Sequence, residues 1–77
     1  MPTALKISGY RFFFYSNEHL PKHIHVEFED GVAKFSLESL ELIKSKRLKA
    51  SEISRMRKLV VENQQLLLEK WDEYFNQ

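Results

Sequence analysis

Residues 23–37 read HIHVEFEDGVAKFSL, a run in which apolar and polar side chains alternate on both sides of an Asp-Gly dipeptide. Strict alternation is typical of half-buried β-strands, because successive side chains of a strand point to opposite faces. Asp-Gly favours a two-residue hairpin turn, whose two central residues both need a positive φ. The sequence therefore predicts strands at about 23–29 and 32–37, joined by a turn at Asp30-Gly31.

The predicted pairing sorts the side chains of this hairpin into two faces. A two-residue turn at that position would place Glu27 opposite Lys34, because each residue before the turn pairs with one after it. The apolar side chains then share one face, whereas the other face carries His23, His25 and Glu27. We expect the apolar face to be buried and the histidine face to be half exposed.

An aromatic segment precedes this hairpin, and a lysine-rich segment follows it. Residues 9–16 read GYRFFFYS and suit a strand better than a helix. Aromatic side chains fall on both of its faces, so we expect this strand to be covered on both sides and central in the sheet. Residues 40–43 form either a short fourth strand or an irregular return, and residues 44–49 are expected to be a loop.

The C-terminal third of the chain has the pattern of one long helix. No Gly or Pro interrupts residues 51–75, Ser51 is a good N-cap, and apolar side chains recur at three- and four-residue steps. Such a helix would extend about 37 Å, so one end is expected to project or to meet another chain. Trp71, Tyr74 and Phe75 are expected to anchor it in the core.

The predicted fold is therefore α+β, with a three- to four-stranded antiparallel β-meander packed against one long C-terminal α-helix. A chain of 77 residues forms one domain over residues 1–77, and its 43% hydrophobic content excludes an intrinsically disordered protein. The absence of cysteine excludes disulfide scaffolds and thiolate chemistry, so a metal would need His and carboxylate ligands.

No apolar run reaches the ~18–20 residues of a membrane span, and the first residues lack the apolar core of a signal peptide. We therefore expect a cytoplasmic protein without a membrane partner. The chain is short enough for self-association to contribute to its stability.

All three histidines of the chain fall within seven residues, at His19, His23 and His25. His23 and His25 would leave their strand on the same side, about 6.6 Å apart, which allows both to bind one Zn²⁺ with His19 as a third ligand. Glu18 or Glu27 would complete that shell. A second interpretation is a metal-free site in which a histidine transfers protons or contacts phosphate. A third is a polar strand face without chemistry, and the sequence requires no cofactor.

Further side chains would join this histidine surface if the strand at 9–16 pairs with the strand at 23–29, namely Arg11, Tyr15, Glu27 and Lys34. Their alternative roles are cross-strand ion pairing and packing. The chain has no Gly-rich phosphate loop, nucleophile elbow or His-Glu-x-x-His helix, so the common hydrolases and nucleotide-binding enzymes find no support in the sequence.

A basic block interrupts an otherwise acidic chain. Residues 44–58 carry seven basic side chains and one acidic side chain, although the whole chain has a net charge of only +1. Such a block attracts phosphate or an acidic protein surface, which predicts a binding surface at Lys44, Lys46, Arg47, Lys49, Arg55, Arg57 and Lys58. The alternative is a solvated face, since no aromatic side chain lies within the block for base stacking.

Together these features resemble a family of small bacterial proteins known as domain-of-unknown-function family 4160. The likeness spans nearly the whole chain and is most specific over residues 15–26, YSNEHLPKHIHV. That stretch is similar to the family pattern aromatic-x-Asn-Asp/Glu-His-x-Pro-Pro-His-x-His-Val, with Lys22 in place of the second proline. Residues 9–12 and 66–71 also match. The resemblance implies a toxin–antitoxin-like pair and marks the histidine segment as the signature of the family.

The resemblance and the residues together favour a binding component. The expected function is one member of a toxin–antitoxin-like pair that engages a small cognate protein, with nucleic acid as a further ligand. The alternative is a small ribonuclease-like toxin in which His19, His23 and His25 perform acid–base or metal-assisted chemistry, zinc being the candidate metal. A homo-oligomer without chemistry is the third option.

Overall fold

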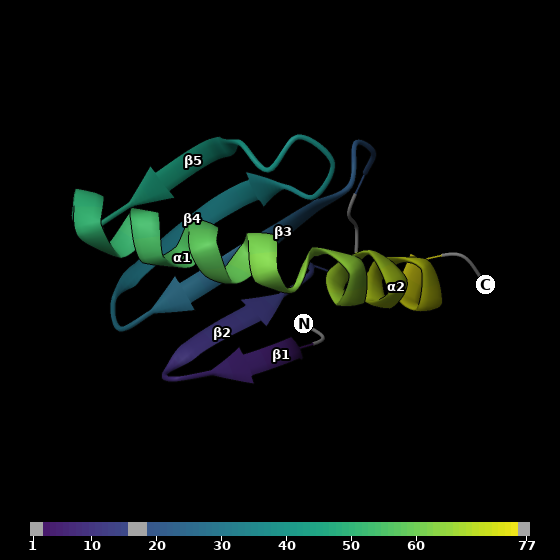
Figure 1. Ribbon diagram of the computed structural model, residues 1–77, viewed down its shortest axis with the longest axis horizontal. Coiled ribbons are helices and arrows are strands. Elements are labelled where there is room, and N and C mark those ends of the chain that lie inside the picture. Colours follow the sequence, from purple (N-terminus) through teal and green to yellow (C-terminus); the bar gives the residue numbers. More distant parts are fainter. Residues whose placement is uncertain (1–2, 16–18, 76–77) are drawn as a thin grey trace.

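The computed structural model describes residues 3–15 and 19–75, which form five strands followed by two helices (Figure 1). The strands are β1 (Thr3–Ile7), β2 (Tyr10–Phe13), β3 (His23–Phe28), β4 (Gly31–Ser36) and β5 (Leu42–Lys46). The helices are α1 (Ala50–Glu62) and α2 (Gln64–Phe75). Each strand pairs antiparallel with the next in the order β1-β2-β3-β4-β5. The predicted α+β class and antiparallel meander are confirmed.

Strand β1 is missing from the prediction, which starts its first strand at Gly9. Ile7 pairs with Tyr10, and the two residues between them, Ser8 and Gly9, have φ values of 49° and 85°. Positive φ at both central positions is what a type I′ hairpin turn requires, and Ser-Gly is a known turn dipeptide. Gly9 therefore belongs to a turn, and the sheet has five strands instead of three or four.

The β3–β4 hairpin is present as predicted, but its turn lies one residue earlier. Phe28 pairs with Gly31, so the turn residues are Glu29 and Asp30, of which Glu29 has a φ of 54°. Gly31 is needed for close packing instead, since a Cβ there would lie 2.6 Å from the carbonyl oxygen of Arg47. The predicted turn position of Gly31 is therefore wrong, and close packing is the physical reason for a glycine there.

The earlier turn changes every cross-strand partner of the hairpin by two positions. Glu27 faces Val32 instead of Lys34, and Lys34 faces His25. A shift of two residues leaves each side chain on its predicted face, because side chains alternate with a period of two. The predicted sorting into faces therefore holds, whereas the predicted Glu27–Lys34 pair is wrong.

The chain after β4 forms an edge strand that begins within the possible strand predicted at 40–43 and continues into the predicted loop at 44–49. β5 carries Lys44 and Lys46, and these residues lie at one edge of the sheet. Lysine is common on edge strands because its charge discourages pairing with another chain. The lysine density that suggested a loop is thus equally compatible with an edge strand.

The predicted long helix is divided at Asn63. α1 begins at Ala50 after an N-cap at Lys49, so Ser51 is not the cap. At the break, the Asn63 side chain donates a hydrogen bond of 2.8 Å to the carbonyl oxygen of Leu59. Asparagine side chains compete in this way with the backbone hydrogen bonds of a helix. The result is two helices in place of one, and no described helix is long and apolar enough to cross a membrane.

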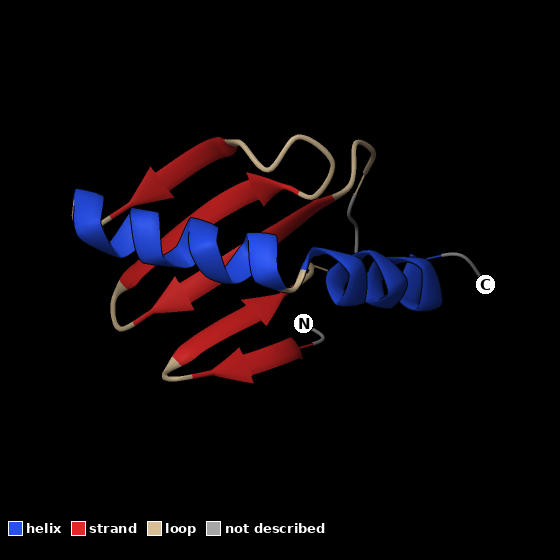
Figure 2. Ribbon diagram, in the orientation of Figure 1, coloured by secondary structure: helices blue, strands red, loops and turns tan. Residues whose placement is uncertain are grey.

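The core lies between the sheet and the helices. Both helices lie on the same side of the sheet, α1 across its face and α2 past the ends of the strands (Figure 2). Trp71 of α2 is 5% exposed and lies 5.6 Å from the ring of Phe14. The Lys22 ammonium also binds the Asp72 carboxylate over 3.0 Å. The far end of the predicted helix therefore packs against the chain at the ends of β2 and β3, with Trp71 as the predicted anchor, whereas Tyr74 is 38% exposed.

Candidate functional site

Two cross-strand rows of side chains define the face of the sheet that lies opposite the helices, which we call the open face. The first row crosses all five strands and consists of Thr3, Phe13, His25, Lys34 and Lys44, each paired with the next. The second row lies beside it and consists of Lys6, Arg11, Glu27, Val32 and Lys46. Directly paired residues point to the same side of a sheet, so all ten side chains share this face.

The open face is strongly basic. Its two rows contain five Lys or Arg side chains and one carboxylate, a formal charge of +4, whereas the whole chain carries +1. The carboxylate of Glu27 accepts a hydrogen bond from Arg11 Nε over 2.9 Å, which neutralises that arginine. Lys34, Lys44 and Lys46 form no ion pair within residues 3–15 and 19–75. Three ammonium groups thus lie on two neighbouring strands without a described counter-ion.

His25 lies in an aromatic cluster at the centre of the open face. Its imidazole stacks on the Phe13 ring at 5.3 Å between centroids and meets the Tyr15 ring edge-on at 4.5 Å. The guanidinium carbon of Arg11 lies 4.2 Å from the Phe13 centroid, a cation–π contact. This packing leaves His25 only 9% exposed, so the predicted half exposure of the histidine face is wrong. Tyr15, by contrast, is 45% exposed and brings an aromatic ring to the surface.

His23 and His25 are adjacent, as predicted, but their surroundings differ. Their ring centroids are 5.3 Å apart. The Nδ1 atom of His23 lies 2.9 Å from the carbonyl oxygen of Pro21, and its ring lies 5.4 Å from that of Trp71. His23 is therefore packed against α2 at the end of the sheet, whereas His25 lines a surface pocket. His19 is exposed in the segment before β3.

The candidate zinc ligands do not form a cluster among the residues that the structure describes. No three His, Asp or Glu side chains within residues 3–15 and 19–75 are placed to hold a metal ion together. Glu18, a candidate fourth ligand, lies outside those ranges. What the described part of the histidine segment supplies to the pocket is one imidazole, that of His25, on the strand next to Lys34.

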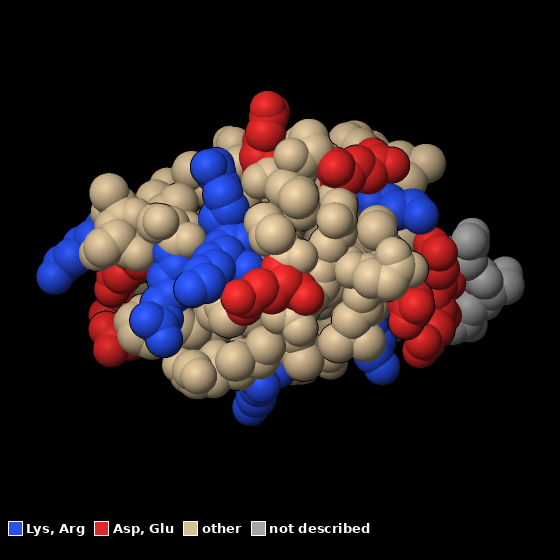
Figure 3. Space-filling model, in the orientation of Figure 1, with Lys and Arg blue, Asp and Glu red and all other residues tan. Residues whose placement is uncertain are grey.

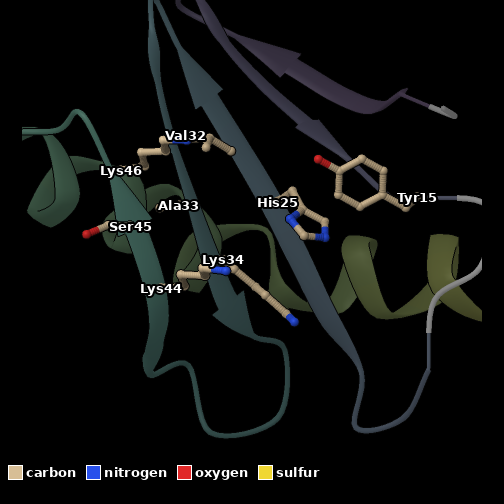
Figure 4. Close-up of a pocket in the computed structure, with 8 residues that line it drawn as sticks. All are labelled: Tyr15, His25, Val32, Ala33, Lys34, Lys44, Ser45 and Lys46. Carbon is tan, nitrogen blue, oxygen red and sulfur yellow. The ribbon is translucent and has the colours of Figure 1, made fainter.

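A pocket of about 300 Å³ opens on this face between the end of β2 and strand β5. Figure 4 shows Tyr15 and His25 on one side of it and residues of β4 and β5 on the other, Lys34 and Lys44 among them. The volume is at the lower end of the ~300–1,000 Å³ typical of ligand sites. The pocket combines an exposed aromatic ring with ammonium groups, which are the two chemical groups that contact a nucleotide.

The basic block of the sequence does not form one surface. Lys44 and Lys46 lie on the open face, whereas Arg55, Arg57 and Lys58 belong to α1 on the other side of the sheet. Figure 3 views that other side and shows Lys and Arg gathered over α1, with Asp and Glu near the end of α2. The remaining two residues, Arg47 and Lys49, line a hollow together with the acidic residues Glu29, Asp30 and Glu52. The predicted single footprint is therefore wrong as a spatial unit.

Folding also brings residues to the open face that the sequence interpretation left out of it. Lys6 was missed because β1 was missed, although the Ser8-Gly9 turn could have indicated both. Tyr15 and Lys34 were expected there only if β2 pairs with β3, and that pairing is present. The basic block contains no aromatic residue, but the fold places Tyr15 in the same pocket as two of its lysines, Lys44 and Lys46.

Comparison with known proteins gives a family but no described activity. A search of the curated proteins and a search of the solved structures each found no match. The model of the family described as a domain of unknown function, DUF4160, matches residues 9–72, from the first turn to α2. That match covers most of the chain and confirms the resemblance seen in the sequence: this protein belongs to the DUF4160 family.

Proposed function

We propose that this protein is a nucleic-acid-binding component that holds its ligand on the open face of the sheet. The observation that carries the proposal is the pairing of Lys34 with Lys44, with His25 on the other side of Lys34. Like charges directly opposite each other on neighbouring strands destabilise a sheet. A polyanion bound between the two lysines would relieve this repulsion, and that relief would favour binding.

The electrostatics of the rest of the open face support the same ligand. Glu27 is engaged by Arg11, so it does not neutralise the lysines of the neighbouring strands. A face with a formal charge of +4 attracts phosphate groups whatever the sequence of the nucleic acid. Since the open face holds more positive charge than the whole protein, the remaining surface is acidic on balance. The charge of the protein is therefore distributed asymmetrically, and the protein would turn its open face toward a polyanion.

We further propose that the protein acts as one member of a toxin–antitoxin-like pair in the cytoplasm, together with a small cognate protein. The support for this part is the membership of the DUF4160 family and the resemblance from which such pairs were inferred. This proposal is tested by purifying a tagged form of the protein from its native host and looking for a small untagged protein that purifies with it. A protein that purifies alone from its own cells, at every salt concentration, would contradict it.

The binding function is tested with two double variants that remove equal charge from the same sequence block. Lys44→Ala with Lys46→Ala removes two positive charges from the open face, whereas Arg55→Ala with Arg57→Ala removes two from α1. Fluorescence anisotropy with a labelled single-stranded oligonucleotide would be measured between about 50 and 200 mM salt. Each lost phosphate contact lowers the salt slope by about 0.7, so the first variant should lose about 1.4. Equal losses in both variants would show that the open face is not the binding surface.

A ribonuclease activity is the second candidate, because His25 lines the same pocket as Lys34 and Lys44. In such a reaction an imidazole would take the proton of a ribose 2′-hydroxyl, whose oxygen attacks the adjacent phosphorus atom while the bond to the 5′-oxygen breaks and that oxygen takes a proton from water. Lysines beside the phosphate would stabilise its added negative charge. Products ending in a 2′,3′-cyclic phosphate, absent with His25→Phe, which keeps a ring packed against Tyr15, would establish it. Intact RNA after prolonged incubation with the wild-type protein would eliminate it.

A further inference from the structure

The pocket on the open face has the composition of a site for one nucleotide of a single strand. We propose that a phosphate lies over Lys34 and Lys44 while the attached base stacks on Tyr15, so that the ligand is single-stranded. This inference rests on the proposed binding function and adds the class of nucleic acid.

Tyr15 is the aromatic residue of the pocket that a base can reach. Phe13 is 2% exposed and is covered by Arg11, whose guanidinium carbon lies 4.2 Å from the ring centroid. Tyr15 is 45% exposed, and its ring is held edge-on by its neighbours, with centroids 5.5 Å from Phe13 and 4.5 Å from His25. An aromatic ring that is fixed on one side and exposed on the other is a stacking platform for a base.

The distance across the sheet suits one nucleotide. Tyr15 follows β2, and Lys34 lies on β4, so one strand separates them. Neighbouring strands are about 4.8 Å apart, which puts the ring and the ammonium-bearing strand about 10 Å apart. Lys34 lines the same pocket, and its side chain extends from β4 toward β3 (Figure 4). A lysine side chain is long and flexible enough to turn from there toward a phosphate beside the ring. A base on Tyr15 and its own phosphate at Lys34 therefore fit within one pocket of about 300 Å³.

A duplex cannot use this arrangement. Its bases are stacked on one another, so their faces are hidden and only the phosphates can contact the protein. The lysines of the open face would still attract a duplex, but Tyr15 would add nothing. The predicted preference for a single strand thus depends on the tyrosine and not on the charge.

The test compares ligands and variants of the full-length protein by fluorescence anisotropy at one salt concentration. The probes are a single-stranded DNA, a single-stranded RNA, a duplex of the same length, and an abasic strand that keeps every phosphate. The variants are Tyr15→Leu, which removes the ring, and Tyr15→Phe, which keeps it. Circular dichroism melting confirms that each variant is folded.

We expect the wild-type protein to bind a single strand about tenfold more tightly than the duplex or the abasic strand. Tyr15→Leu should bind single strands about tenfold more weakly than the wild-type protein and should bind the duplex and the abasic strand as well as the wild-type protein does. Tyr15→Phe should keep the wild-type affinity for single strands. Whichever of DNA and RNA binds more tightly identifies the natural sugar.

Equal affinity of the wild-type protein for the intact and the abasic strand would overturn the inference, and this comparison requires no variant. Competition by polyglutamate of equal charge, as effective as that of the single strand, would also overturn it, since the face would then respond to charge alone. Both results leave the proposed function standing if the lysine variants still lose affinity for nucleic acid. The proposed function itself fails only if none of the nucleic acids binds to the open face.

Discussion

Replacement of Lys44 by glutamine is expected to stabilise the folded protein and to weaken its binding of nucleic acid at the same time. Lys44 lies directly opposite Lys34, and neither lysine has an ion-pair partner among the described residues. Two unit charges about 5 Å apart in water repel each other by about 0.8 kcal/mol. The exposed side chains can move apart, which lowers this figure, and cross-strand pairs generally contribute ~0.2–1 kcal/mol. We therefore expect the free energy of unfolding to rise by about 0.5 kcal/mol at low salt.

The gain is measured by urea unfolding, followed by the fluorescence of Trp71, the single tryptophan of the chain. In a domain of this size it corresponds to an increase of about 2–4 °C in Tm. At about 1 M salt the Debye length falls to about 3 Å, so the gain should disappear. Lys58→Gln is the matched control, because Lys58 lies near Glu62 on α1 and its loss should give no gain. A stabilisation that persists unchanged at high salt, or none at low salt, would refute the reasoning.

Three further predictions concern the scaffold. Gly31→Ala should lower the free energy of unfolding by about 1–3 kcal/mol in urea, because the added methyl group overlaps Leu48, and Gly31→Asn should cost more. If asparagine is the milder substitution, the glycine serves the turn after all. Trp71→Ala should remove about 3–5 kcal/mol and leave the protein largely unfolded by circular dichroism, whereas Trp71→Phe should still fold. Lys22→Ala should change stability by less than about 1 kcal/mol, because its ion pair with Asp72 is exposed, and a larger loss would contradict that assignment.

The hairpin shows how far alternation alone can predict a structure. The period of two in residues 23–37 correctly identified two strands and assigned each side chain to its face. It could not fix the register, because a shift by two residues preserves both faces. In the observed register Gly31 packs against the chain at Arg47 and Leu48, a contact between segments sixteen or more residues apart. A local pattern carries no information about such a contact.

Burial on the open face was also beyond the sequence pattern. His25 was expected to be half exposed because its strand face is polar and no helix was predicted over it. The structure buries it between flat side chains of its own face, namely Phe13 and Tyr15. The aromatic residues on both faces of the segment 9–16 had suggested cover on both sides, and the cover on this side is a layer of rings and a guanidinium group. Side chains can thus cover a sheet without a second layer of secondary structure.

The basic block does not form one surface, although its residues are close in sequence. The chain changes from strand to helix within the block, and the strand presents its lysines on one side of the sheet whereas the helix lies on the other. Between Lys46 and Arg55 the chain leaves the edge of the sheet and crosses to its other side, so one block supplies two surfaces. The antiparallel meander has the opposite effect on distant residues. It places Lys44 and Tyr15 at the same pocket although 29 positions separate them in the sequence. The strands β3 and β4 come between these two residues in the sequence, and they lie side by side in the sheet between β2 and β5.

The packing around His25 predicts a role for this histidine that requires neither a metal nor a reaction. A side chain at the position of His25 must pack against rings on two sides and still face a pocket beside lysines. An aliphatic residue would pack there but would offer no hydrogen bond to a phosphate, and a lysine would add a third ammonium group next to Lys34. Imidazole is flat and polar, so it can pack against the Tyr15 ring and still offer a hydrogen bond on the pocket side. His25→Phe should therefore preserve the fold and the stacking of a base, whereas His25→Ala should release Tyr15 and weaken single-strand binding much as Tyr15→Leu does. Equal binding by all three proteins would mean that the histidine does not hold the tyrosine in place.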